Sequence, residues 1–153
     1  MNLILWRHAE AHDLAASGND LDRTLTARGE KQAKRVGQWL DRQLPDTTRI
    51  LVSPARRTEQ TAIALGRRYK VRPELAPGCT TAQLLELVSW PDEKATVLVV
   101  GHQPTLGQVI AQLLELKSSD CAVKRGAVWW LRSRERAGLL QTVVVTVHSP
   151  EVL

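Results

Sequence analysis

Three apolar segments of the sequence each end in a polar cluster whose residue types suit phosphoryl chemistry. The clusters are Arg7-His8 after residues 2–6, Ser53-Pro54-Ala55-Arg56-Arg57 after residues 49–52, and Gly101-His102 after residues 95–100. Arginine carries a permanent charge in a planar fork that matches phosphate oxygens, and a neutral imidazole nitrogen is a competent nucleophile at phosphorus. Guanidinium groups repel metal cations, and no carboxylate or thiolate cluster accompanies the histidines. The clusters therefore predict a phosphate site without a metal.

The elements that must position these clusters follow from the pattern of apolar residues. Short apolar runs predict strands, and apolar positions at helical spacing predict helices between them. Helices are expected from the N-cap Thr26 to about Leu44, through residues 58–68, from the capping-box residue Thr80, and from Pro104. Residues 71–75 are expected to form a short edge strand, and residues 127–131 and 140–147 a C-terminal hairpin. The alternation predicts an α/β fold: a three-layer α/β/α sandwich with a mostly parallel central sheet and an antiparallel C-terminal strand pair.

This architecture explains why the three clusters should meet. Continuous apolar strands are typical of central positions buried on both faces of a parallel sheet. Ligands of such sheets bind outside the carboxyl ends of the strands. We therefore expect His8, Arg57 and His102 to converge at one edge. Each alone would be unremarkable as a turn residue, so the prediction depends on the agreement of all three strand ends.

Composition and charge narrow the class of protein. The 153 residues, 43% of them hydrophobic and 24% charged, are expected to form a single domain, 1–153. The net charge of +5 comes from scattered basic pairs, which suits an acidic or phosphorylated partner, and no nucleic-acid motif is present. No membrane span or targeting segment is recognised, and Cys79 and Cys121 fit no metal or redox spacing. We expect a cytoplasmic protein that binds neither nucleic acid nor membranes.

Four short blocks of the sequence carry a resemblance to a known family. They are Arg7-His8-Ala9-Glu10, Thr24-Leu25-Thr26-x-x-Gly29, Ser53-Pro54-x-x-Arg57-x-x-Gln60-Thr61 and Val99-Val100-Gly101-His102-x-Pro104. Together, in this order, they resemble the histidine phosphatase (phosphoglycerate mutase-like) superfamily. The chain is most similar to its short SixA-type branch of phosphohistidine phosphatases. The blocks span roughly the first two-thirds of the chain, and only their combination is specific.

The resemblance implies a role for each matching residue. His8 would be the nucleophile that becomes phosphohistidine, while Arg7, Arg57 and His102 would bind the phosphoryl oxygens. Arg23 would add a further phosphate contact, and no cofactor is implied. Ala9 stands where the family has glycine, which is tolerable if its backbone φ is negative.

Proton transfer is the open part of the predicted mechanism. His8 should be neutral, because Arg7 and Arg57 disfavour a second positive charge, and a backbone carbonyl should fix its tautomer. The protonation state of His102 stays open. Larger family members carry a carboxylate acid that has no obvious counterpart in this chain. Asp20 and Asp22 flank Arg23, and one of them could orient it or donate a proton.

The missing acid favours one substrate class. An alkoxide leaving group needs a proton from the enzyme, whereas imidazole leaves more easily and carries its own proton. The leading hypothesis is a phosphatase that hydrolyses phosphohistidine on an acidic phosphocarrier or phosphotransfer protein through phospho-His8. One alternative is a phosphatase of the same fold acting on a small phosphate ester or nucleotide. Another is a basic binding module without catalysis.

Overall fold

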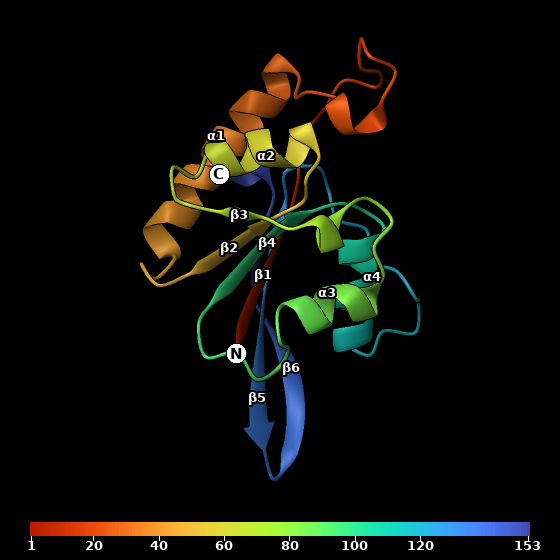
Figure 1. Ribbon diagram of the computed structural model, residues 1–153. Helices are drawn as coiled ribbons and strands as arrows, with labels where there is room; N and C mark the ends of the chain where they lie inside the picture. Colours follow the sequence, from red (N-terminus) through yellow and green to blue (C-terminus); the bar gives the residue numbers. More distant parts are fainter.

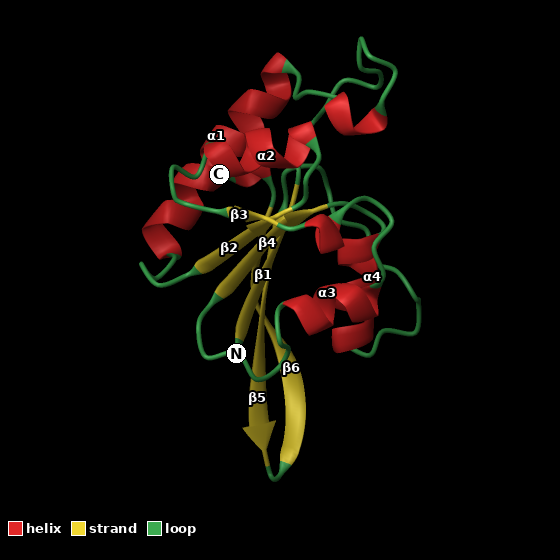
Figure 2. Cartoon of the chain, in the orientation of Figure 1, coloured by secondary structure: helices red, strands yellow, loops and turns green.

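The computed structural model describes residues 1–153 and contains one six-stranded sheet with helices on both faces (Figures 1 and 2). The strands are β1 (Asn2–Arg7), β2 (Arg49–Val52), β3 (Lys70–Val71), β4 (Val97–Gly101), β5 (Val128–Arg136) and β6 (Leu139–His148). The helices are α1 (Ala27–Gln43), α2 (Arg56–Ile63), α3 (Thr81–Leu87) and α4 (Thr105–Leu113), and short 3₁₀ helices form at Asp20–Asp22, Pro73–Leu75 and Pro150–Val152.

The strand order β3-β2-β4-β1-β5-β6 confirms the predicted sheet. β3, β2, β4 and β1 pair in parallel, whereas β5 is antiparallel to β1 and β6 is antiparallel to β5. β4 lies between the other two apolar strands, with Trp6 paired with Val100 and Val52 paired with Val100 from the opposite side. The ends of β1, β2 and β4 therefore lie side by side, as the three polar clusters required.

Alternating residues of the central strands build two cores, one on each face of the sheet. On one face Leu3, Leu5 and Val99 pack with α3 and α4, and on the other Ile4, Trp6 and Val100 pack with α1 and α2. This alternation follows from the two-residue period of a strand. It explains why these segments read as unbroken apolar runs, and it confirms the three-layer sandwich. No helix combines the length and the apolar character needed to cross a lipid bilayer.

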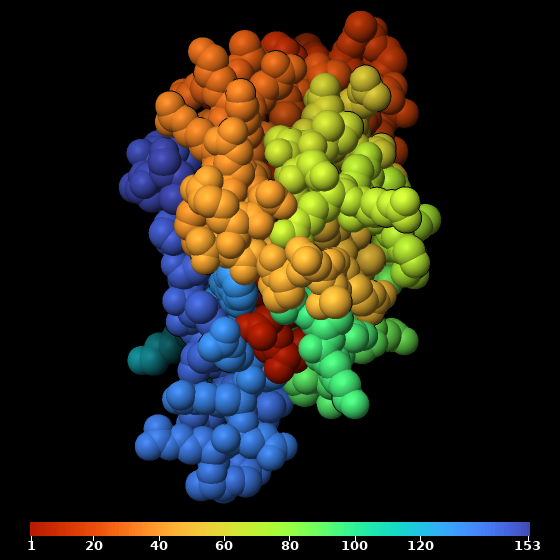
Figure 3. Space-filling model, turned by 90° about the vertical axis from the view of Figure 1, so that its left-hand side faces the viewer, coloured from red at the N-terminus to blue at the C-terminus, as the bar shows by residue number.

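Three predicted boundaries were wrong. α2 ends at Ile63 rather than near Arg68, and the chain turns at Gly66, whose φ is +78°. The edge strand β3 is only two residues long, because Pro73 begins a 3₁₀ helix. β5 continues through the charged residues to Arg136 and leaves only Ala137 and Gly138 for the turn. The long hairpin extends beyond the rest of the sheet and forms the blue lower end of the molecule in Figure 3.

Candidate active site

The carboxyl ends of β1, β2 and β4 open into a small pocket of about 160 Å³. Its lining residues are Arg7, His8, Ala11, Arg23, Arg57, Pro77, His102, Gln103 and Arg125. Four of these are arginines, two are histidines and none carries a carboxylate. The structure therefore brings together the strand-end residues that the sequence singled out, in a pocket suited to a small anion.

His8 is held as a neutral ring with one nitrogen free. Its Nδ1 lies 2.8 Å from the carbonyl oxygen of Ala9. A carbonyl can only accept, so Nδ1 carries the proton and the lone pair remains on Nε2. Burial lowers the pKa of His8 to about 4, against the raising effect of this hydrogen bond, and the charges of Arg57 and Arg7 lower it further. The predicted neutral state and fixed tautomer therefore both follow from local contacts.

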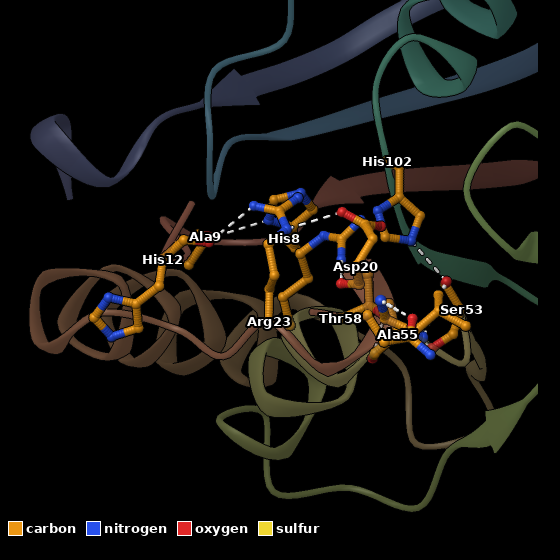
Figure 4. A network of polar contacts seen from close by, with 12 residues as sticks. His8, Ala9, His12, Asp20, Arg23, Ser53, Ala55, Thr58 and His102 are labelled. Atoms are coloured by element: carbon orange, nitrogen blue, oxygen red, sulfur yellow. Dashed lines mark hydrogen bonds and ion pairs between the residues drawn. The ribbon is translucent and has the colours of Figure 1, made fainter. Parts of the chain in front are cut away.

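His102 faces His8 across the pocket, with ring centroids 5.4 Å apart (Figure 4). Its Nε2 lies 2.7 Å from the hydroxyl oxygen of Ser53, and that oxygen accepts a hydrogen bond from the amide of Ala55. The Ser53 hydroxyl can donate its proton to His102 Nε2, and in that tautomer the ring's own proton lies on Nδ1. Burial and the neighbouring His8 lower the pKa of His102 to about 3. His102 is consequently neutral at pH 7, the point that the sequence left open.

Arg7 and Arg57 are each tied at one end of the guanidinium and free at the other. Arg7 Nη1 donates to the carbonyl oxygen of Val123 at 2.7 Å. Arg57 donates through Nη1 and Nη2 to the backbone and carboxylate oxygens of Asp20. The Nε of each arginine and Nδ1 of His102 are buried and have no hydrogen-bond partner. Buried polar groups are normally hydrogen-bonded, so donors without a protein partner at this position are suited to a bound anion.

The loop between β1 and α1 supplies Asp20 and Arg23, but only part of what the sequence predicted there. Asp20 accepts from Arg23 Nε at 2.9 Å, and Arg23 Nη1 donates to the carbonyl of His12 at 3.0 Å. Asp22 instead accepts a hydrogen bond from Ser17 and does not line the pocket. In Figure 4 the ring of His12 points away from His8 and His102.

Other motif residues hold the backbone of the site rather than lining it. Thr61 Oγ1 accepts from the amide of Ala9 at 3.1 Å, and Gln60 Oε1 accepts from the amide of Leu25 at 2.7 Å. Thr26 caps α1 through Gly29. A Cβ at Gly29 would lie 1.9 Å from the carbonyl oxygen of Glu10, so only glycine allows α1 to approach the loop after His8 this closely. These contacts explain the spacing of the sequence blocks.

Ala9 is accommodated where the family has glycine. It is fully buried and is absent from the residues with positive φ, so its methyl group causes no backbone strain. Sequence reasoning missed Pro77 and Gln103 in the pocket lining and the pairing of Ser53 with His102. The position of Gln103, inside the block Gly101-His102-x-Pro104, was the one available signal for it. No group of three or more His, Cys, Asp or Glu side chains could hold a metal ion.

Comparison with known proteins identifies the class to which this fold and site belong. Residues 3–84 match the model of the "Histidine phosphatase superfamily (branch 1)". Phosphohistidine phosphatase SixA of Escherichia coli is 35% identical over 123 residues, which cover 74% of each chain. A SixA homolog of Haemophilus influenzae is 33% identical over 129 residues, covering 74% of this chain and 77% of that one. The chain belongs to the histidine phosphatase superfamily and is a phosphatase.

Solved structures agree with this assignment. The protein histidine phosphatase SixA in complex with tungstate superposes with a TM-score of 0.82 at 28% identity, covering 99% of each chain. A phosphoserine phosphatase variant from Entamoeba histolytica superposes with a TM-score of 0.73 at 19% identity, covering 99% of this chain and 98% of that one. The second likeness concerns the fold alone, so the two structures define a shared scaffold rather than a shared substrate.

Proposed function

We propose that the protein is a phosphohistidine phosphatase that hydrolyses the phosphoryl group from a histidine of an acidic phosphocarrier or phosphotransfer protein. The observation that carries the proposal is a pocket with four arginines and two neutral histidines but no side chain able to give a proton to a leaving alkoxide. Relatives named as phosphohistidine phosphatases support the same substrate class.

His8 is the proposed nucleophile. Its Nε2 lone pair attacks phosphorus, the P–N bond of the substrate breaks, and the substrate imidazole leaves with that electron pair and its own ring proton. In the second step a water oxygen attacks phosphorus and the bond to Nε2 breaks. Both water protons leave on inorganic phosphate as dihydrogen phosphate, and His8 regains the lone pair. The carbonyl of Ala9 keeps the proton on Nδ1 throughout, which keeps Nε2 available.

The buried donors stabilise the transferring group. Arg7, Arg57 and His102 line the pocket, and the Nε groups of both arginines and Nδ1 of His102 have no protein acceptor, so N–H groups of these side chains are available to a phosphoryl group. Donors fixed in advance stabilise the charge that builds on the equatorial oxygens at little reorganisation cost. Arg23 and Arg125 extend the positive lining toward the pocket mouth, where an acidic protein surface would approach.

The absence of an acid separates phosphohistidine from phosphate esters. Asp20 is the carboxylate bonded to pocket residues, and the hydrogen bond from Arg23 and the charge of Arg57 hold its pKa below the usual range, outweighing the opposite effect of burial. Asp20 is therefore ionised at neutral pH and is a poor proton donor. A leaving group that needs no proton from the enzyme suits this site best.

The deciding experiment compares substrates under identical conditions. The kcat/KM for a phosphohistidine-bearing phosphotransfer protein should exceed that for a phosphoserine peptide or a sugar phosphate by at least about 100-fold, because ester cleavage lacks an acid. The His8→Ala variant serves as the control for contaminating phosphatases. Equal or faster hydrolysis of the esters would contradict the proposal and favour a small-ester phosphatase.

A further inference from the structure

Asp20 connects two pocket arginines that come from different parts of the chain. Its carboxylate accepts from Arg23 Nε at 2.9 Å through one oxygen and from Arg57 Nη2 at 3.1 Å through the other. Its backbone carbonyl accepts from Arg57 Nη1 at 2.9 Å. Arg57 is only 3% exposed, whereas the side chain of Asp20 is 58% exposed. A largely exposed loop residue thus accounts for every hydrogen bond that the buried guanidinium makes.

These three contacts determine which donors remain for a ligand. Asp20 takes one N–H of each Nη of Arg57, so the second N–H of each Nη and the Nε–H, which has no protein partner, remain for a phosphoryl group. On Arg23, Asp20 takes the Nε–H and the carbonyl of His12 takes one N–H of Nη1, which leaves the second N–H of Nη1 and both of Nη2. Each guanidinium is therefore oriented by its occupied side, and Asp20 contributes to both.

We infer that Asp20 is a positioning residue, whose carboxylate and carbonyl align Arg57 and Arg23 so that their remaining N–H groups meet the transferring phosphoryl group. The inference builds on the proposed function, and it decides between orienting an arginine and donating a proton, the two roles that the sequence allowed for this aspartate. It also extends the orienting role from Arg23 to Arg57, which lies 37 residues beyond Asp20 in the chain.

The two roles differ in what they require of the leaving group. A general acid matters only when a basic leaving group departs, and it has no part in the equilibrium binding of an oxyanion. A positioning residue affects every step in which the arginines contact the anion, whatever the leaving group. Oxyanion binding and the cleavage of a substrate that needs no acid therefore distinguish the roles.

The test measures tungstate binding by calorimetry and kcat/KM for p-nitrophenyl phosphate, whose leaving group needs no proton. Asp20→Ala should weaken tungstate binding and lower kcat/KM by about 10- to 100-fold each, the usual effect of losing charge-assisted hydrogen bonds. Asp20→Asn keeps an acceptor oxygen and should recover part of both losses. Asp22→Ala is the matched control, since Asp22 lies two residues away on the same loop and bonds only Ser17.

The outcomes are separable from those of the proposed function. If Asp20→Ala binds tungstate and cleaves p-nitrophenyl phosphate like the parent enzyme, Asp20 does not position the arginines. If Asp22→Ala shows the same losses, the effect belongs to the loop and the inference fails. His8→Ala should abolish turnover while still binding tungstate; retained turnover there would overturn the proposed function, whatever the Asp20 variants show. Thermal unfolding of each variant verifies that it is folded.

Discussion

The polar groups at the two ends of the central strands differ in whether they form hydrogen bonds within the protein. At the amino ends the polar side chains pair with one another: Asn2 Oδ1 accepts from Trp130 Nε1 at 2.9 Å and from Arg132 Nε at 2.8 Å. Arg49 likewise pairs with Glu93 at 3.0 Å. At the carboxyl ends three buried nitrogen atoms, on Arg7, Arg57 and His102, have no hydrogen-bond partner within the protein.

The difference indicates that the amino ends of the strands serve stability and the carboxyl ends serve ligand binding. Paired groups at the amino ends contribute modestly to the free energy of folding. Unpaired buried donors at the carboxyl ends lower it, and such groups persist in proteins where a ligand completes them.

Arg7→Met should separate activity from stability most clearly. It removes a guanidinium that carries a buried, unpartnered Nε and replaces it with an apolar chain of similar length. We expect kcat/KM to fall by roughly 100- to 1,000-fold, as when a fixed transition-state donor is removed. The free energy of unfolding in urea should change by less than about 2 kcal/mol, because the removal of a costly buried group offsets the loss of the hydrogen bond from Nη1 to the carbonyl oxygen of Val123. A large loss of stability would contradict the contrast.

The pH dependence follows from the lowered pKa values of His8 and His102. An unfolded histidine titrates near 6.5, whereas the folded pKa values are about 4 and about 3, so the unfolded chain binds more protons between these limits. Above pH 6.5 His8 is neutral in both the folded and the unfolded chain, so its full contribution to the free energy of unfolding is present. This contribution is lost as the pH falls toward 4. It amounts to roughly 3 kcal/mol at 1.36 kcal/mol per pH unit.

Two measurements check this prediction. Urea unfolding between pH 4 and pH 7 should show a smaller loss of stability on acidification for His8→Asn than for the parent enzyme. The acid limb of kcat/KM should lie near pH 4, because His8 stays neutral down to its folded pKa. An acid limb near 6.5 would show that His8 is not desolvated as the structure indicates.

Ser53→Ala tests the support of His102. Without the hydroxyl, His102 Nε2 loses its partner at 2.7 Å, and the proton is no longer directed to Nδ1. We expect kcat to fall by about 10-fold while the free energy of unfolding drops by about 1 kcal/mol. Steady-state kinetics alongside denaturant unfolding would check both values, and an unchanged kcat would exclude the tautomer assigned to His102.

Asn2→Ala is the counterpart at the amino ends. Removing an acceptor shared by Trp130 and Arg132 should lower the free energy of unfolding by about 1 kcal/mol. kcat/KM should stay within about twofold of the parent value, since the residue lies at the opposite end of β1 from His8. A large kinetic effect would mean that the two ends are not independent.

The parts of the fold that the sequence predicted are those with a strong local signal. Strands buried on both faces read as unbroken apolar runs, and Thr26 and the Thr80–Gln83 capping box mark helix starts, as the structure confirms. The charged half of β5 was missed because residues such as Arg134 and Arg136 resemble a loop. Their strand conformation comes from pairing with β6, a contact that no local pattern reveals.

The residues of the site likewise include some that the sequence could predict and some that it could not. His8, Arg7, Arg57 and His102 could be placed together, because parallel strands fix where their carboxyl ends meet. Asp20 and Asp22 could not be told apart, since both lie just before Arg23 in the sequence and only the path of the loop brings Asp20 to Arg57. Pro77 enters the pocket from the segment after β3, for which the sequence has no positional signal.

The central claim is that Nε2 of His8 takes the phosphoryl group from a phosphohistidine protein. The most direct measurement is rapid-quench analysis with a substrate protein radiolabelled on its phosphohistidine. The account predicts a transient label on the enzyme that is stable in base, labile in acid, located at His8 and absent from His8→Ala. Release of phosphate by the parent enzyme with no label on His8 at any time, or full turnover by His8→Ala, would contradict it.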